Sequence, residues 1–226
     1  MTKNLLSLNN ISKWYGDVDK PEIVLDHLQL SVNENDFLVI LGKSGCGKST
    51  LLRIIAGLIE ANAGEVLYQG KKFTKDYPRI AMVFQSHALF PWLNVLENVE
   101  LGLEALDLEP QERRKRALEV IDLIGLDGYE SAYPKELSGG MRQRVGFARA
   151  LVVNPDILLL DEPFSALDIL TADNIRSDFV ELWIERRIPT KAIIMVSHNV
   201  VEAVELANRL VILRHNPGVL FKEIEV

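Results

Sequence analysis

An apolar run leads directly into a glycine-rich segment in Phe37-Leu38-Val39-Ile40-Leu41-Gly42-Lys43-Ser44-Gly45-Cys46-Gly47-Lys48-Ser49. The second part matches the pattern G-x-x-x-x-G-K-[ST]. Glycines let successive backbone N–H groups turn inward around a phosphate, because no Cβ stands in the way. The segment therefore predicts a buried strand, a phosphate-binding loop and a helix that begins near Lys48, whose N-terminal dipole favours an anion.

Two side chains of this segment have specific expected roles. Lys48 is expected to reach the β- and γ-phosphates of a nucleotide, and Ser49 to hold Mg²⁺ through its hydroxyl. The alternative is a purely structural glycine-rich turn between a strand and a helix. The candidate nucleotide-binding residues here are Gly42, Ser44, Gly45, Cys46, Gly47, Lys48, Ser49 and Thr50.

A second apolar run, residues 157–160, ends in the carboxylates Asp161 and Glu162. The carboxyl ends of buried parallel strands form the ligand-binding edge of a sheet. We expect Asp161 to engage Mg²⁺ through water and Glu162 to act as the general base that polarises the attacking water. Alone, the run also fits a strand that ends in a solvated turn, but together with the phosphate loop it predicts a catalytic edge.

The sequence Leu137-Ser138-Gly139-Gly140-Met141 predicts a second anion site. Ser138 is suited to cap a helix, and Gly139 and Gly140 leave its first N–H groups uncovered. The alternative is an ordinary capped helix. Two phosphate sites on two subdomains suggest that the sites meet across an interface.

The hydrophobic pattern predicts an α/β core interrupted by a helical insert. Residues 91–151 show helical periodicity without a strong strand, and residues 111–124 place Ala117, Leu118, Ile121 and Ile124 on one side of a helix. The basic cluster Arg113–Arg116 is interpreted as a solvated helix face. Strands are expected at residues 5–12, 23–32, 36–41, 64–70, 79–84, 157–160, 192–196 and, last, 209–213, and helices from about residue 48 and at 111–124, 169–186 and 200–208.

Composition narrows the class of protein. The 226 residues fit one domain with an inserted subdomain, and 48% are hydrophobic, which is enough for a core. With a net charge of −7, the chain lacks the positive electrostatic field that non-specific nucleic-acid binding needs. Cys46 is the single cysteine, which excludes an internal disulfide. Residues 1–6 show no signal-peptide pattern, and no apolar run approaches the length of a membrane span, so we expect any membrane partner to be another chain.

The order of the phosphate loop, Leu137–Gly140 and Leu160-Asp161-Glu162-Pro163 resembles the ATP-binding-cassette (ABC) ATPases over nearly the whole chain. The resemblance implies a P-loop NTPase (RecA-like) core with an N-terminal antiparallel β subdomain and an inserted α-helical subdomain. Residues 1–226 would form one cassette, with 1–90 and 152–226 as the core and 91–151 as the helical insert. It also implies ATPase activity with ATP and Mg²⁺.

Further positions match the family pattern. Tyr15 resembles the aromatic residue that stacks on adenine, with Trp14 as the weaker candidate. Gln85 resembles the glutamine that touches Mg²⁺ and the attacking water, and His198 the histidine that contacts the γ-phosphate. Ser165–Asp168 resembles the loop that reads the opposite subunit, which makes Asp168 a site residue. The family works as a head-to-tail dimer. Ser138 and Gly140 of one chain would therefore close over the ATP that Lys48 of the other chain holds. The second chain would be either an identical copy or a related cassette.

Three segments resemble the importer branch that serves nitrate, sulfonates such as taurine, and related solutes: residues 89–99, residues 139–144 and Asn216-Pro217-Gly218. This implies an ATPase subunit at the cytoplasmic face of the membrane, bound to an integral permease and served by an extracytoplasmic solute-binding protein, with no nucleic-acid partner. The apolar residues 89–93 fit either packing between subdomains or a partner's groove, and Trp92 fits both.

Three alternatives share part of this chemistry. An exporter or lipid-transporter cassette has the same motifs, although the apolar segment around Trp92 argues mildly against it. Cassettes of DNA repair or translation usually carry coiled coils, zinc modules or a second cassette, which are absent from this sequence. An ATP-switched regulatory module with little turnover is disfavoured by the intact Glu162.

Overall fold

The computed structural model describes residues 3–17, 20–72, 78–86 and 88–226. Met1 and Thr2, part of the segment without a signal-peptide pattern, lie outside the described residues. Two compact units divide the chain. The first comprises Met1–Ile80, Leu159–Asp161 and Lys191–Val226, and the second Ala81–Leu158 and Glu162–Thr190.

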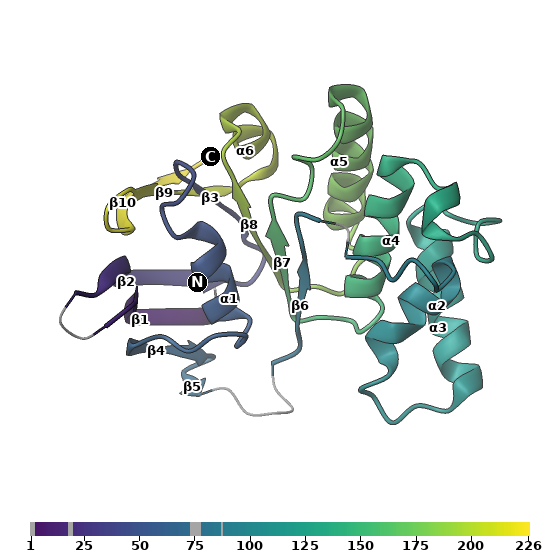
Figure 1. Cartoon of the computed structure of the whole chain (residues 1–226), viewed down its shortest axis with the longest axis horizontal. Coiled ribbons are helices and arrows are strands. Elements are labelled where there is room, and N and C mark those ends of the chain that lie inside the picture. Colours follow the sequence, from purple (N-terminus) through teal and green to yellow (C-terminus); the bar gives the residue numbers. More distant parts are fainter. Residues whose placement is uncertain (1–2, 18–19, 73–77, 87) are drawn as a thin grey trace. The chain divides into compact units, whose positions relative to one another are not determined.

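An antiparallel sheet occupies the N-terminal part of the first unit (Figure 1). The strand order is β2-β1-β4-β5, and β1 is antiparallel to both of its neighbours. Leu6 and Leu8 of β1 are buried, as expected for alternate residues that face a core. The strands are β1 (Asn4–Tyr15), β2 (Glu22–Asn33), β4 (Ala63–Tyr68) and β5 (Lys71–Lys72).

A second, largely parallel sheet provides the other layer of the first unit, in the order β10-β9-β3-β8-β7. Strand β3 (Phe37–Leu41) runs parallel to both β8 (Ala192–Ser197) and β9 (Arg209–Arg214). All residues of β3 and β8 are buried, which explains why both read as continuous apolar runs. Helices α1 (Lys48–Ile55) and α6 (Val200–Leu206) belong to the same unit.

The expected last strand at residues 209–213 is followed by one more, so the sequence-based prediction was wrong on this point. Strand β10 (Val219–Glu225) pairs with β9 in antiparallel orientation. It lies at the edge of the sheet, and Phe221, Lys222 and Glu223 are exposed. Edge strands often carry charged residues, so β10 lacks the apolar run by which the other strands were recognised.

Helices dominate the second unit. Strands β6 (Ile80–Val83) and β7 (Ile157–Asp161) each contribute residues to it, and no strand is assigned among residues 91–151, all of which the structure describes. Its helical elements are α2 (Val95–Glu100), η1 (Leu101–Leu103), α3 (Pro110–Leu123), η2 (Pro134–Glu136), α4 (Gly139–Leu151) and α5 (Ile169–Ile184).

Helix α3 corrects one predicted core residue. Ala117, Ile121 and Ile124 are buried as expected, but the side chain of Leu118 is 39% exposed. The three buried residues are spaced by four and three and share one face, whereas Leu118 is rotated by about 100° from Ala117. It lies among the charged residues Arg114, Lys115 and Glu119 on the solvated side of the helix.

Aromatic packing joins α4 and α5 in the second unit. The ring of Phe147 stacks on Phe179 with centroids 4.8 Å apart and lies 6.0 Å from Phe164. These contacts fix α5 against the helix that begins with the Ser138 motif. None of the helices in the described ranges combines the length and the hydropathy needed to cross a membrane.

Candidate functional site

The glycine-rich loop connects the end of β3 to the start of α1. Gly45 and Gly47 have φ values of +79° and +93°, a left-handed conformation that residues with a Cβ rarely adopt. Gly47 is the N-cap of α1, and its position supplies no side-chain cap. The first N–H groups of the helix therefore remain available to an anion, as the sequence predicts.

Lys48 is drawn into this loop. Its side chain is buried, with the residue 5% exposed, and its Nζ donates to the carbonyl oxygens of Gly42 at 2.8 Å and Lys43 at 3.3 Å. The ammonium is therefore held beside the loop's backbone instead of extending into solvent. A positive charge held beside a glycine-rich loop at a helix N-terminus suits a phosphate.

Ser49 and Asp161 meet at the start of α1. The Ser49 hydroxyl donates to Asp161 Oδ1 at 2.8 Å, and Asp161, the last residue of β7, is buried. A hydroxyl and a carboxylate are hard oxygen ligands. Mg²⁺ in nucleotide sites typically takes one or two such groups together with phosphate oxygens and water. The donor set therefore fits Mg²⁺.

His198 lies at the same sheet edge as the phosphate loop. Leu41 of β3 is paired with Ser197 of β8, so the loop and His198 leave adjacent parallel strands at the same level. His198 is exposed, and the following Asn199 caps α6 by accepting from the N–H groups of Val201 and Glu202. The parallel register brings this histidine to the ligand-binding edge that the sequence indicates.

The turn after β9 braces the phosphate loop from outside. Gly218 donates its N–H to Val24 O at 2.9 Å and accepts from Asp26 N–H at 3.0 Å. A Cβ at Gly218 would come within 2.3 Å of Cys46 O, so only glycine fits against the loop there. His215 of the same turn lies 3.6 Å from the place of a Cβ on Gly45. Asn216-Pro217-Gly218 resembles the importer branch in sequence, but nothing in these residues alone predicts this contact.

Tyr15 is better placed than Trp14 to meet a ligand. Tyr15 ends β1 with 46% of its surface exposed, and Lys13 Nζ lies 5.0 Å from its ring centroid. Trp14 is less exposed than Tyr15, and its backbone N–H donates to Asn62 Oδ1. An exposed ring at a strand end is available for stacking on a base.

Glu162, the first residue of the second segment of the second unit, has an unusual backbone dihedral angle. Its φ is +47°, a left-handed value that is rare for residues other than glycine and is found disproportionately at functional sites. Ser165 Oγ donates to Glu162 O at 2.9 Å, and Gln85 Nε2 donates to Ser165 Oγ at 3.3 Å. Three predicted elements, the segments around Gln85, Glu162 and Ser165, are thus linked by hydrogen bonds in one unit.

The Ser138 motif forms a capped helix start, as predicted. Ser138 Oγ accepts from Met141 N–H at 3.2 Å, and Gly139 and Gly140 form the first residues of α4. A Cβ at Gly140 would lie 2.5 Å from Thr171 Cγ2, so α4 and α5 approach closely only because this residue is glycine. Ser138 itself is exposed.

Asp168 begins the neighbouring helix α5. Its carboxylate accepts from Thr171 N–H at 3.0 Å, and this hydrogen bond lowers the pKa of Asp168 from its usual value. The residue is exposed to solvent. Its role as a helix cap was not predicted, although Asp three residues before Thr171 at the start of an apolar periodicity is a recognised cap signal.

The predicted residues fall into two groups. Within the first unit the structure brings together Gly42, Ser44, Gly45, Cys46, Gly47, Lys48, Ser49, Thr50 and Asp161, with His198 on the adjacent strand and Tyr15 at the end of β1. Within the second unit it places Gln85, Glu162, Ser138, Gly139, Gly140 and Asp168. Each unit therefore holds one helix N-terminus with the features of an anion site.

One positioning residue was missed entirely. Arg149 of α4 donates to Ala88 O at 2.8 Å and so holds the backbone that follows Gln85. Burial lowers the pKa of Arg149. An arginine near the end of an amphipathic helix is typical of an exposed position, so nothing in the sequence indicated this contact.

The fold and the glycine-rich loop are those of a P-loop ATPase, and a second, serine-capped helix start accompanies them. A family model described as "ABC transporter" matches residues 25–165, and the chain belongs to this family. The aliphatic sulfonates import ATP-binding protein SsuB of Bacillus cereus is 41% identical over 220 residues, which cover 97% of this chain and 85% of that protein. The bicarbonate transport ATP-binding protein CmpD of Synechocystis sp. is 39% identical over 225 residues, covering 99% and 79%.

A solved structure supports the same assignment. A dimeric post-hydrolysis state of an ATP-binding cassette bound to ADP and Pi matches with a TM-score of 0.83 and 34% identity, over 98% of each chain. The expected fold, a P-loop core with an antiparallel β subdomain and a helical insertion, is confirmed. The chain is an ATPase of the ABC family. The importer branch that its sequence resembles is also the one to which the sulfonate and bicarbonate relatives belong by name.

Proposed function

We propose that this chain is the ATP-hydrolysing subunit of an importer for a small solute of the nitrate, sulfonate or taurine type. The observation that carries the proposal is that one chain contains two different helix starts. Helix α1 has no side-chain cap and begins at the buried Lys48, and helix α4 is capped by the exposed Ser138. The names of the sulfonate and bicarbonate relatives support the solute class.

In this proposal the phosphate loop holds the nucleotide. The N–H groups of residues 45–50 and the Lys48 ammonium bind the β- and γ-phosphates, and Tyr15 stacks on the base. Ser49 and Asp161, with Gln85, would hold Mg²⁺, which supplies charge neutralisation of the phosphates when bound. The hydrogen bond between Ser49 and Asp161 supports this assignment, because it already places two magnesium-type ligands together.

Glu162 is the proposed general base. Its carboxylate takes a proton from the attacking water as the water oxygen bonds to the γ-phosphorus, and the bond to the β–γ bridging oxygen breaks to release ADP and phosphate. His198 contacts the γ-phosphate, and Gln85 orients the water. The hydrogen bonds from Gln85 to Ser165 and from Ser165 to Glu162 O support a coupled placement of base and glutamine.

The Ser138 motif is proposed to complete the site of a second copy of the chain. Ser138, Gly139 and Gly140 of one chain would bind the γ-phosphate held by Lys48 of the other, with Asp168 reading the opposite subunit. The exposure of Ser138 and the dimeric state of the ADP-bound relative support a head-to-tail dimer with two ATP molecules. Loss of the γ-phosphate would remove the attraction that holds such a dimer closed.

The permease is proposed to dock on the segment that follows Gln85. Asn98 fixes this turn, because its side chain bonds the N–H and carbonyl of Phe90 and the carbonyl of Leu93. The turn presents Trp92 with 68% of its surface exposed, and Phe90 lies 5.2 Å from it between ring centroids. A rigidly held, exposed pair of aromatic rings suits a partner's apolar groove.

We propose residues 91–151 as the mobile helical subdomain and residues 1–90 and 152–226 as the catalytic core of one cassette. The chain would sit at the cytoplasmic face of the membrane, held there by the permease, and an extracytoplasmic solute-binding protein would select the cargo. No nucleic-acid partner is proposed.

Glu162→Gln tests the chemistry first. It should abolish steady-state hydrolysis of Mg-ATP, by about 10²-fold or more, while ATP binding persists, because the amide keeps the shape of the site without accepting the proton. Hydrolysis at the wild-type rate would overturn the role of Glu162.

The same variant tests the transport role. With ATP and Mg²⁺, a tagged Glu162→Gln chain should remain closed on its partner and recover a multi-span permease from the native membranes, as identified by mass spectrometry. Glu162→Gln/Trp92→Ala should recover much less permease while still binding ATP. Recovery of nucleic acid, or of no membrane protein, would contradict the importer assignment and leave only the ATPase chemistry.

A further inference from the structure

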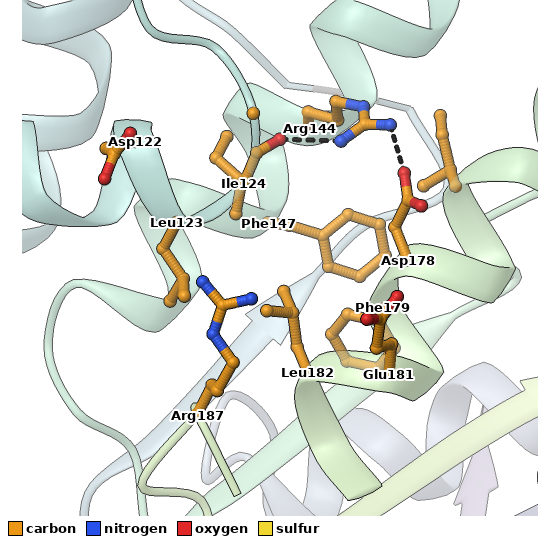
Figure 2. Close-up of a pocket in the computed structure, with 12 residues that line it drawn as sticks. Asp122, Leu123, Ile124, Arg144, Phe147, Asp178, Phe179, Glu181, Leu182 and Arg187 are labelled. Carbon is orange, nitrogen blue, oxygen red and sulfur yellow. Dashed lines mark hydrogen bonds and ion pairs between the residues drawn. The ribbon is translucent and has the colours of Figure 1, made fainter. Parts of the chain in front are cut away.

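A cavity of about 320 Å³ opens in the second unit, away from both helix starts (Figure 2). The end of α3, the middle of α4 and the second half of α5 surround it. Its volume lies in the range of small-molecule sites. None of the predicted nucleotide or coupling residues lines it.

The floor of the cavity is apolar and well packed. Phe147, Phe179 and Leu182 line it and are buried, and the two rings stack at 4.8 Å. Leu123 and Ile175 complete the apolar wall. Because these side chains are held by the packing of α4 against α5, the surface is preformed, which reduces the entropic cost of binding an apolar group.

The two arginines of the cavity differ. Arg144 is fixed, because it donates to Ile124 O at 2.7 Å and forms an ion pair with Asp178 at 2.5 Å. Arg187 makes a long ion pair of 4.0 Å with Glu185, and its side chain is half exposed. Figure 2 shows its guanidinium directed between Leu123 and Leu182, toward the Phe147 ring. A cation with a long ion pair thus points between apolar side chains of the cavity.

The acidic residues limit the charge of a ligand. Asp122 and Glu181 also line the cavity, and Asp178 is neutralised by Arg144. Figure 2 shows Asp122 at the end remote from Phe147. Two further carboxylates disfavour a polyanion such as a nucleotide, whereas a single anionic group can pair with Arg187.

We propose that this cavity binds a small organic monoanion, an aliphatic or aromatic carboxylate or sulfonate, with its apolar body on Phe147, Phe179 and Leu182 and its anionic group on Arg187. The ligand would bridge α4 and α5, whose first turns carry Ser138 and Asp168. Filling the cavity would stiffen this helix pair and change the rate of ATP hydrolysis. That last step rests on the proposed function, but the binding itself does not.

A pair of matched dyes tests the site. The probes are 8-anilinonaphthalene-1-sulfonate and the uncharged N-phenyl-1-naphthylamine, which share the same ring skeleton. Both should bind the full chain saturably, with enhanced fluorescence. Arg187→Gln should weaken the sulfonate dye about three- to fivefold, the range of a partly exposed ion pair, and leave the uncharged dye unchanged. Arg186→Gln, which removes a neighbouring charge outside the cavity, should change neither.

A filled cavity provides the second measurement. Leu123→Trp should fill the cavity and prevent both dyes from binding. A thermal melting curve and an ATP-binding measurement check that this variant is folded. If that variant does not fold, the proposal is tested by the difference between the affinity changes of the two dyes in Arg187→Gln. Equal responses of both dyes to Arg187→Gln, absence of saturable binding, or displacement of the sulfonate dye by ATP would overturn the proposal.

The effect on hydrolysis separates binding from regulation. The sulfonate dye at saturation should change the ATPase rate of the wild-type chain and have a smaller effect on Arg187→Gln at the same concentration. Dye binding that depends on Arg187 without any change in rate would overturn the coupling to hydrolysis but not the site. Failure of the Glu162→Gln experiment would affect only the proposed function.

Discussion

The N-termini of helices α1 and α4 differ in how their first N–H groups are arranged. Helix α1 begins at Gly47 without a side-chain cap and with the buried Lys48 as its first residue. Helix α4 begins at Ser138, whose hydroxyl already satisfies one N–H group, and Ser138 is exposed. The first terminus has the Lys48 ammonium and the hydrogen-bonded Ser49–Asp161 pair within one unit, whereas the second presents its N–H groups and the Ser138 hydroxyl.

This difference teaches which terminus can act alone. We expect a loop that keeps an ammonium ion, left-handed glycines and the Ser49–Asp161 pair together to bind a nucleotide without a second chain. A capped and exposed helix start without a buried cation of its own gains most from an anion that another molecule already holds. The comparison therefore predicts that damage to α1 removes binding, and damage to α4 removes turnover but not binding.

Lys48→Ala should have the largest effect. Loss of the buried ammonium removes the positive charge that faces the phosphates, so hydrolysis should fall by roughly 10²- to 10³-fold and ATP binding should weaken as well. Equilibrium binding of a fluorescent ATP analogue and a phosphate-release assay check both effects. Lys71→Ala, which removes an exposed lysine from β5, is the matched control. Normal ATP binding by Lys48→Ala would mean that α1 does not act alone.

Gly140→Ala should have an intermediate effect. Its Cβ would meet Thr171 Cγ2 at 2.5 Å, so the Thr171 side chain or one of the two helices must shift, at a cost of about 1–3 kcal/mol in the free energy of unfolding. Hydrolysis should fall at least about tenfold, while ATP binding stays normal. Both quantities are measured on the purified chain together with its melting temperature.

Two further variants sharpen the Gly140 experiment. Gly139→Ala places its Cβ 3.5 Å from Leu167 Cδ2, an ordinary contact, so its melting temperature should change much less. Thr171→Ser removes the clashing methyl group and should restore part of the stability of Gly140→Ala. Weakened ATP binding in Gly140→Ala would contradict the separation of binding from turnover.

Asp168→Asn should have the smallest effect on stability, and this effect should depend on pH. The hydrogen bond from Thr171 N–H lowers the folded-state pKa of Asp168 below its usual value of 3.8. The charge therefore adds stability above pH 3.8, and this contribution is lost as pH falls through the lower folded-state pKa. Asparagine still caps the helix but does not titrate. The melting-temperature advantage of the wild type should thus shrink on acidification, and a constant difference would exclude this linkage.

The core strands and the phosphate loop could be predicted because their sequences obey strong local rules. Strands β3, β7 and β8 are buried along their whole length and are therefore continuously apolar, and Gly45 and Gly47 occur where left-handed backbone is needed. The cap at Ser138 followed from the same kind of rule. Asp161 and Glu162 were predicted from the apolar strand that they follow, whereas Tyr15, Gln85, His198 and Asp168 were identified by the family resemblance, and the roles of all six stay predictions.

What escaped prediction depends on contacts between distant residues. Strand β10 is polar because it is an edge, Leu118 faces away from the core because of its angular position, and Arg149 bonds Ala88 O across a turn. The left-handed backbone of Glu162 also has no local sequence signal, since glutamate rarely adopts it. Periodicity reports the average face of an element and not such individual contacts.

The brace formed by Gly218 has a consequence for biosynthesis. The phosphate loop of residues 42–49 leans on a turn that is encoded near the opposite end of the chain, with Gly218 bonded to Val24 and packed on Cys46. A ribosome releases the loop long before this turn. The nascent chain can therefore form its first strands early, but the brace on the phosphate loop forms only after the β9–β10 hairpin has emerged.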